Sequence, residues 1–154
     1  MRRLLLALGL LSVVAIGCGS SSDGDVVAQA DGFCKTAQAD QLKLLDGTAS
    51  NSKDPKVMKA YLESSHKETE ELNGQLRDLT PPSDQKEAWN TWIASLDDQE
   101  KASKELIETV KPGMASGKTS PYVTALNEAI AQQVKRNKLA SDLGLETCGQ
   151  NASI

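Results

Sequence analysis

Histidine is almost absent from this sequence, and its scarcity limits the metal chemistry open to the chain. His66 is the only histidine. Glu63 and His66 have the Glu-x-x-His spacing of di-iron helical bundles, and Glu70 follows one turn later. Such a site needs a second pair from another helix, which the chain cannot supply. We therefore expect no metal site, and we expect His66 to lie on a solvated face beside Lys67 and Glu68.

Motifs of nucleophilic catalysis are missing as well. The sequence has no Gly-x-Ser-x-Gly elbow and no Gly-rich phosphate loop. Ser-x-x-Lys, the acylation motif of penicillin-recognising enzymes, occurs at 50–53, 64–67 and 83–86, without its Ser-Asp-Asn and Lys-Thr-Gly companions. Three matches in a chain rich in Ser and Lys indicate chance. We predict a protein that is not an enzyme and uses no cofactor.

An excess of positive charge is also lacking. Seventeen Lys and Arg stand against 21 Asp and Glu, which gives a net charge of −4 at pH 7. Removal of Arg2 and Arg3 with a signal peptide would leave 15 against 21. Nucleic acids and anionic lipid headgroups repel such a chain, so neither is an expected partner.

The start of the chain has the pattern of an export signal. Arg2 and Arg3 precede an uncharged apolar run over residues 4–16, as in secretory signal peptides. This run is shorter than the roughly 20 residues that a transmembrane helix needs. The string Ala15-Ile16-Gly17-Cys18 resembles the bacterial lipobox. That resemblance implies cleavage before Cys18, a diacylglycerol on its thiol, and a lipid anchor on the extracytoplasmic face of the cell membrane.

These features predict how the chain is divided. We expect a signal peptide at 1–17, a lipidated tether at 18–25, one folded domain at 26–149 and a loose tail at 150–154. The tether residues after Cys18 are small and polar, so they cannot bury anything.

Cysteine usage agrees with export. With Cys18 set aside for acylation, Cys34 and Cys148 remain as an even pair near the two ends of the folded region. In an oxidising compartment such a pair is expected to form a disulfide. The alternative is two free, buried thiols, the commoner state in a cytosol.

Apolar residues spaced three and four apart predict four helices and no strand. Expected boundaries are Val26 to about Leu45, Pro55 to Pro81-Pro82, Ser83-Asp84 to Pro112-Gly113, and Pro121 to Gly144. Asp54 and Ser120 each precede a proline and are expected to be N-caps. Four helices of similar length joined by short breaks indicate an all-α, up-down-up-down four-helix bundle with one disulfide.

Three short strings carry a resemblance over the whole chain. Phe33-Cys34-Lys35, Pro81-Pro82 and the closing Leu-Gly-Leu-x-x-Cys-Gly of residues 143–149 are similar to those of small secreted helical lipoproteins of high-GC Gram-positive bacteria. The resemblance implies a helical bundle. Because that group has no assigned activity, it implies nothing about chemistry.

The helical periodicity also predicts the core. Trp89 and Trp92 are the largest apolar groups and lie on one helical face, so we expect them to be buried; an exposed pair would instead mark a binding surface. The predicted core comprises Leu72, Leu76, Trp89, Trp92, Leu96, Leu126, Ile130 and Val134.

A polar layer is expected at mid-bundle. Antiparallel alignment of the predicted helices brings six polar side chains to similar levels, namely Ser65, Thr69, Gln99, Ser103, Gln133 and Asn137. These groups either satisfy one another and the solvent, or line a small ligand cavity.

Two functions fit these features. The first is a membrane-anchored, non-catalytic interaction or scaffold module of the cell envelope, with an envelope protein as a possible partner. The second is an extracytoplasmic small-ligand or metal binder that uses the polar layer or the cluster of Glu63, His66 and Glu70.

Overall fold

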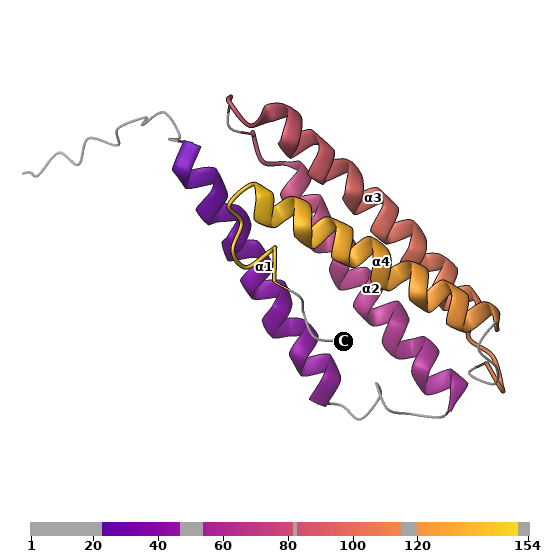
Figure 1. Ribbon diagram of the computed structural model, residues 1–154. Helices are drawn as coiled ribbons and strands as arrows, with labels where there is room; N and C mark the ends of the chain where they lie inside the picture. The colour runs from indigo at the N-terminus through magenta and orange to yellow at the C-terminus, as the bar shows by residue number, and fades with distance from the viewer. Residues whose placement is uncertain (1–22, 47–53, 82, 115–119, 151–154) are drawn as a thin grey trace, which may run out of the picture.

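The computed structural model describes residues 23–46, 54–81, 83–114 and 120–150, and within them the chain forms four α-helices (Figure 1). They are α1 (Asp23–Asp46), α2 (Pro55–Arg77), α3 (Lys86–Glu108) and α4 (Pro121–Asp142). Successive helices run in opposite directions along one common axis, and no strand occurs in the described ranges. The predicted all-α four-helix bundle is confirmed.

The structure describes the residue before α2, α3 and α4, and in two of these three helices a side chain there caps the helix start. The carboxylate of Asp54 accepts a hydrogen bond from the Lys56 N–H at 2.9 Å, and the hydroxyl of Ser120 accepts one from the Val123 N–H at 3.2 Å. Both predicted N-caps are therefore confirmed. The predicted helix start at Ser83-Asp84 is wrong. These residues form a turn, and α3 begins after Gln85, whose side chain makes no capping hydrogen bond.

The first helix begins at Asp23, three residues before its predicted start. Cys18, residues 1–17 and residues 151–154 lie outside the described residues, as does most of the predicted tether. None of the four helices is both long and apolar enough to cross a bilayer.

The core is centred on the two tryptophans. Trp89 and Trp92 are each 1% exposed, and their rings meet edge to face with centroids 5.0 Å apart. Such aromatic pairs contribute stabilisation beyond the area that they bury. Leu72, Leu76 and Leu96 are buried in the same cluster, which confirms this part of the predicted core.

The predicted core is wrong at two positions. Ile130 is 39% exposed and Val134 is 54% exposed, whereas Leu126 is partly buried. The cause is the packing order: α1 packs on α2, α2 on α3 and α3 on α4, whereas α1 and α4 make no direct helix–helix contact. A closed four-helix ring would have covered that face of α4.

The segment that follows α4 takes the place of a direct contact between the first and last helices. Figure 1 shows it turning from the end of α4 across to α1. Leu143, Leu145 and Cys148 of this segment are buried in the main core. Residues 143–150 are therefore part of the folded domain.

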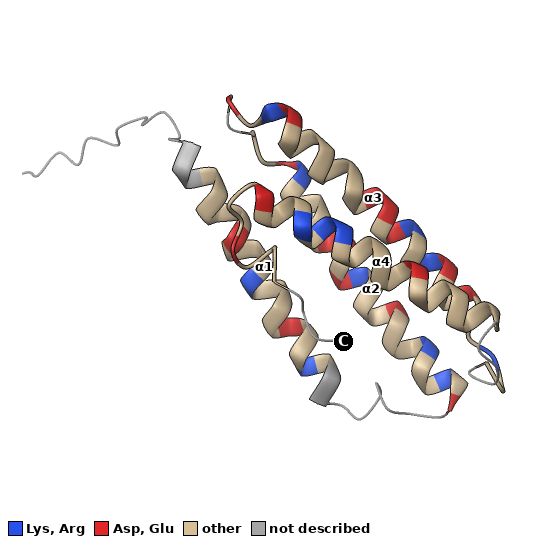
Figure 2. Cartoon of the chain, viewed as in Figure 1, with Lys and Arg blue, Asp and Glu red and all other residues tan. Residues whose placement is uncertain are grey.

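Acidic and basic residues both occur along α2, α3 and α4 (Figure 2). Several form ion pairs within one helix, such as Lys67 with Glu71 and Lys138 with Asp142. Exposed pairs of this kind contribute little stability, typically about 0 to 1 kcal/mol.

Candidate functional site

Residues 143–150, the C-terminal segment, are joined to α1 by the Cys34–Cys148 disulfide and by hydrogen bonds to Asp31. We call this set of contacts the clasp. Cys34 and Cys148 form a disulfide with their Cα atoms 5.2 Å apart, within the usual range for such bonds. This confirms the predicted pairing. The bond ties α1 to the segment after α4, which carries Cys148 to that helix.

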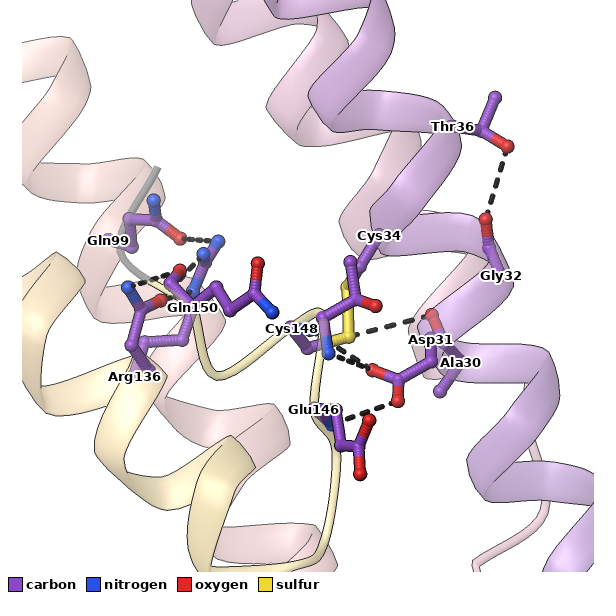
Figure 3. Close-up of a disulfide and its surroundings, with 12 residues drawn as sticks. Ala30, Asp31, Gly32, Cys34, Thr36, Gln99, Arg136, Glu146, Cys148 and Gln150 are labelled. Carbon is purple, nitrogen blue, oxygen red and sulfur yellow. Dashed lines mark hydrogen bonds between the residues drawn. A yellow bond between two sulfur atoms is a disulfide. The ribbon is translucent and has the colours of Figure 1, made fainter. Parts of the chain in front are cut away.

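Asp31, one turn before Cys34, holds the same segment through its carboxylate. The backbone N–H groups of Glu146, Thr147 and Cys148 donate to it at 2.9, 2.8 and 3.1 Å (Figure 3). Successive N–H groups that converge in this way form a binding site for an anionic group. One sequence signal could have indicated this role: Asp31 is an acidic residue three positions before the helical Cys34 and lies on the same helix face.

Two glycines allow the segment to take this path. Gly144 has φ of +80°, a conformation that residues with a Cβ rarely adopt. At Gly149 a Cβ would lie 2.8 Å from the Leu145 carbonyl oxygen and would also collide with the hydroxyl of Ser141. The clasp thus depends on glycine at both positions.

Arg136 of α4 lies near the clasp, and its hydrogen-bond partners among the described residues are side-chain amides. Its Nε and Nη2 donate to Oδ1 of Asn137 at 3.2 and 2.8 Å, and its Nη1 donates to Oε1 of Gln99 at 2.8 Å. Asn137 is buried and in turn donates from Nδ2 to the Gln150 carbonyl oxygen at 3.0 Å. Burial lowers the pKa of the Arg136 guanidinium to about 10, so it is still charged at neutral pH.

A small pocket opens beside this arginine. It has a volume of about 30 Å³ and lies between α1, α2, α4 and the C-terminal segment. Its lining combines the disulfide and the apolar residues Ala37 and Leu72 with polar groups, namely Gln38, Gln41, Thr69, Arg136, Thr147 and Gln150.

A second pocket, of about 80 Å³, lies between α1 and α2 and is acidic. Asp40, Glu68 and Glu71 contribute carboxylates to its lining. Burial, helped by the negative charges of Asp40 and Glu71, raises the pKa of Glu68 above its ordinary value. These carboxylates repel one another, so this pocket favours neutral or cationic groups.

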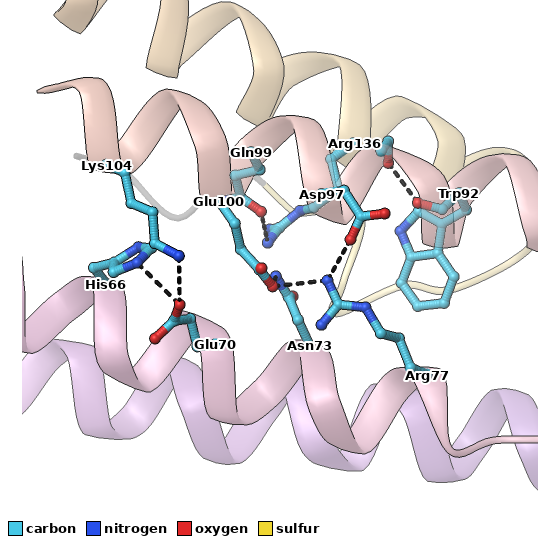
Figure 4. Close-up of polar contacts among 11 residues, drawn as sticks. His66, Glu70, Asn73, Arg77, Trp92, Asp97, Gln99, Glu100, Lys104 and Arg136 are labelled. Atoms are coloured by element: carbon cyan, nitrogen blue, oxygen red, sulfur yellow. Dashed lines mark hydrogen bonds and ion pairs between the residues drawn. The ribbon is translucent and has the colours of Figure 1, made fainter.

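The interface of α2 with α3 contains a network of hydrogen-bonded charged and amide side chains (Figure 4). Asn73 is fully buried and donates to Glu100 at 2.8 Å, and Arg77 donates to both Glu100 and Asp97 at 2.8 and 2.7 Å. Burial alone would lower the pKa of Arg77, but the hydrogen bonds that it donates to these two carboxylates raise the pKa above its usual value. Each of the three charged groups in this network, Arg77, Asp97 and Glu100, has a partner of opposite sign.

His66 is not on a solvated face, so that prediction is wrong. It is 9% exposed, and its Nε2 lies 3.2 Å from Oε1 of Glu70, which also pairs with Lys104 of α3 at 3.0 Å (Figure 4). Packing of α3 over α2 covers the imidazole. The Lys104 ammonium already supplies the cation beside Glu70, and Glu63 pairs with Lys59 instead. Within the described ranges no three His, Cys, Asp or Glu side chains are arranged to hold a metal ion.

The predicted polar layer forms only in part. Thr69 and Asn137 are buried, Gln99 is partly buried, and Gln99 and Asn137 share Arg136 as a partner. Thr69 lines the small pocket, while its hydroxyl donates to the Ser65 carbonyl oxygen. Arg136, the centre of the layer, was not predicted because arginine is usually solvent-exposed.

The Ser-x-x-Lys strings show no catalytic arrangement where the structure describes them. The Ser64 hydroxyl donates to the Ala60 carbonyl oxygen and Lys67 pairs with Glu71, while Ser83 and Lys86 are both exposed. The string at 50–53 lies in an undescribed range.

No protein-family model, no curated protein and no solved structure matches this chain.

Proposed function

We propose that this protein is a lipid-anchored, extracytoplasmic interaction module of the cell envelope and not an enzyme. Export is supported by the signal and lipobox pattern ending at Cys18, and by the Cys34–Cys148 disulfide, since disulfides persist chiefly in oxidising compartments. The diacylated Cys18 would hold the bundle at the membrane surface, because two acyl chains give stable attachment.

The observation that carries the interaction role is the open side between α1 and α4. Ile130 and Val134 are one turn apart on α4 and exposed, and Leu42 of α1 is 61% exposed. Leu42 follows Asp31 and Gln38 at helical spacings, so all three share the face of α1 that meets the C-terminal segment. Exposed apolar side chains on neighbouring faces mark interaction surfaces.

Pocket size favours this role over binding of a drug-sized ligand. Sites for such ligands occupy about 300 to 1,000 Å³. The two pockets described above measure about 80 and 30 Å³. A partner with an apolar surface of its own fits the open side better than a large enclosed ligand fits either pocket.

The anchor is tested by fractionation of cells that express the wild-type chain or Cys18→Ser. Wild-type protein should sediment with membranes and incorporate labelled palmitate. Cys18→Ser should do neither, whereas a Cys34→Ser control should still be acylated. Membrane-bound, normally processed Cys18→Ser protein would refute the lipid anchor.

The interaction surface is tested by site-specific crosslinking in intact cells. A photoreactive phenylalanine analogue at Val134 should give a discrete crosslinked product with an envelope protein. The same analogue at Thr91, exposed on α3, is the matched control and should not give that product. If both positions crosslink alike, or neither does, the open side is not an interaction surface.

A further inference from the structure

The two arginines of the described ranges, the exposed Arg77 and the partly buried Arg136, differ in how their charge is balanced. Arg77 is paired with the carboxylates of Asp97 and Glu100. Arg136 donates only to the neutral amide oxygens of Asn137 and Gln99, and no carboxylate of the described ranges forms an ion pair with it. A partly buried charge without a counter-ion is unfavourable, so an anion is the partner that this position lacks.

The guanidinium retains donors for such an anion. Of its five N–H groups, three are used in the bonds to Asn137 and Gln99, which leaves one on each Nη atom. Arg136 lines the small pocket, and the side chains around it add amide and hydroxyl donors from α1 and from the C-terminal segment, namely Gln38, Gln41, Thr147 and Gln150. Figure 3 shows Gln150 and the disulfide between Arg136 and α1.

The size and charge of the pocket select the class of anion. A volume of about 30 Å³ corresponds to roughly two water positions, which suits the two oxygens of one carboxylate. One guanidinium balances a monoanion, whereas a phosphate dianion would bring four oxygens and an unbalanced charge. The apolar contacts that Ala37 and Leu72 provide suit the short carbon chain of an organic acid.

We propose that the pocket beside Arg136 binds the carboxylate group of a small monoanionic organic acid. In the bound state the acid would be held by the free Nη–H groups of Arg136, with the neighbouring amides completing its hydrogen bonds. This site goes beyond the proposed interaction role and does not depend on the lipid anchor or on the open side of α4. Failure of either earlier test would therefore leave it standing.

The test is a titration of the purified full-length protein, labelled with nitrogen-15, with sodium acetate at constant ionic strength. The Arg136 Nε–H and Asn137 side-chain amide resonances should shift and saturate. The melting temperature should rise with acetate concentration, because a ligand of the folded state stabilises it in proportion to ln(1 + [L]/Kd). Sodium chloride and sodium phosphate at equal ionic strength should produce neither effect.

Matched arginine variants locate the site. Arg136→Gln should weaken acetate binding at least about tenfold, since a charged hydrogen-bond donor is lost. Arg77→Gln removes the other arginine of the described ranges, whose charge is already balanced by Asp97 and Glu100, and should leave the acetate affinity within about twofold.

Three results would overturn the proposal. One is the absence of any saturable shift in the wild-type titration, which needs no variant and is independent of folding defects. Another is an equal response to chloride, which would indicate an unselective anion effect. The third is undiminished acetate affinity in a folded Arg136→Gln variant.

Discussion

The end of the bundle that carries the disulfide differs from the opposite end in how deeply its side chains are buried. Every large side chain that is less than 2% exposed and apolar lies at the clasped end: Leu76, Trp89, Trp92, Leu96 and Leu145. At the other end Leu106 is buried, but Met58, Tyr61, Val123 and Leu126 are only partly covered. We therefore expect stability to be concentrated at the clasped end.

Removal of the disulfide should have the largest effect on this difference. The bond joins residues 114 positions apart, and the chain-entropy model gives about 4 to 5 kcal/mol for a loop of this size. The double variant Cys34→Ser/Cys148→Ser should lose stability of that order in urea unfolding. A loss below about 1 kcal/mol would show that the noncovalent clasp around Asp31 holds the segment by itself.

Truncation of one leucine at each end compares their packing directly. Leu76→Ala, in the tryptophan cluster, should cost about 2 to 5 kcal/mol because it leaves a cavity in a closed core. Leu126→Ala should cost about 1 to 1.5 kcal/mol, since its side chain is partly in water already. Urea unfolding of both variants provides the measurement. Equal losses would contradict the proposed concentration of stability at the clasped end.

Asp31→Asn should separate the noncovalent part of the clasp from the disulfide. The substitution keeps the shape of the side chain but removes the charge that accepts three backbone N–H groups, so we expect a loss of about 1 to 3 kcal/mol in urea unfolding. Asp98→Asn, which breaks only an exposed pair with Lys135, is the control and should cost less than about 1 kcal/mol. If the two variants unfold alike, Asp31 contributes no more than a surface pair.

The smallest expected effect is a pH dependence of stability from the ion pair between Glu70 of α2 and Lys104 of α3. The hydrogen bond from Lys104, together with the neighbouring His66, lowers the pKa of the Glu70 carboxyl below its ordinary value of 4.5. A carboxyl with a lowered folded-state pKa stabilises the protein above its unfolded pKa, and this contribution is lost as pH falls through the folded pKa. Urea unfolding at several pH values should show that the stability difference between wild type and Glu70→Gln shrinks from pH 6 toward pH 3. A difference that stays constant over this range would contradict the assignment; Glu63→Gln, on a looser surface pair with Lys59, is the control.

Much of the fold could be predicted from the sequence because its causes are local. Asp54 and Ser120 cap their helices through bonds to N–H groups two and three residues away, and the periodic spacing of Leu72, Leu76, Trp89 and Trp92 assigned them correctly to the core. The pairing of Cys34 with Cys148 followed from counting cysteines in a chain that begins with the pattern of an export signal. Each of these inferences needed only neighbours along the chain or a count.

The candidate site could be predicted only in fragments. Thr69, Gln99 and Asn137 belong to the expected polar layer, but Arg136 at its centre was missed, and His66 was wrongly placed in solvent. Because Arg136 and His66 have charged neighbours along the chain, the pattern of residue types predicts that both are exposed to solvent. What buries them is another helix, and the pattern does not say which helix covers which face.

Four amphipathic helices, two N-caps, a tryptophan-centred core and one disulfide can be inferred from residue order alone, because propensity, capping and periodicity act over a few residues. Three features emerge only from the folded chain: α1 and α4 stay apart, residues 143–150 join them through Asp31 and Cys34, and Arg136 is partly buried among amides. These outcomes depend on how whole faces of distant segments compete for one another. Such competition is settled by the packing of the complete chain and leaves no signature at any single position.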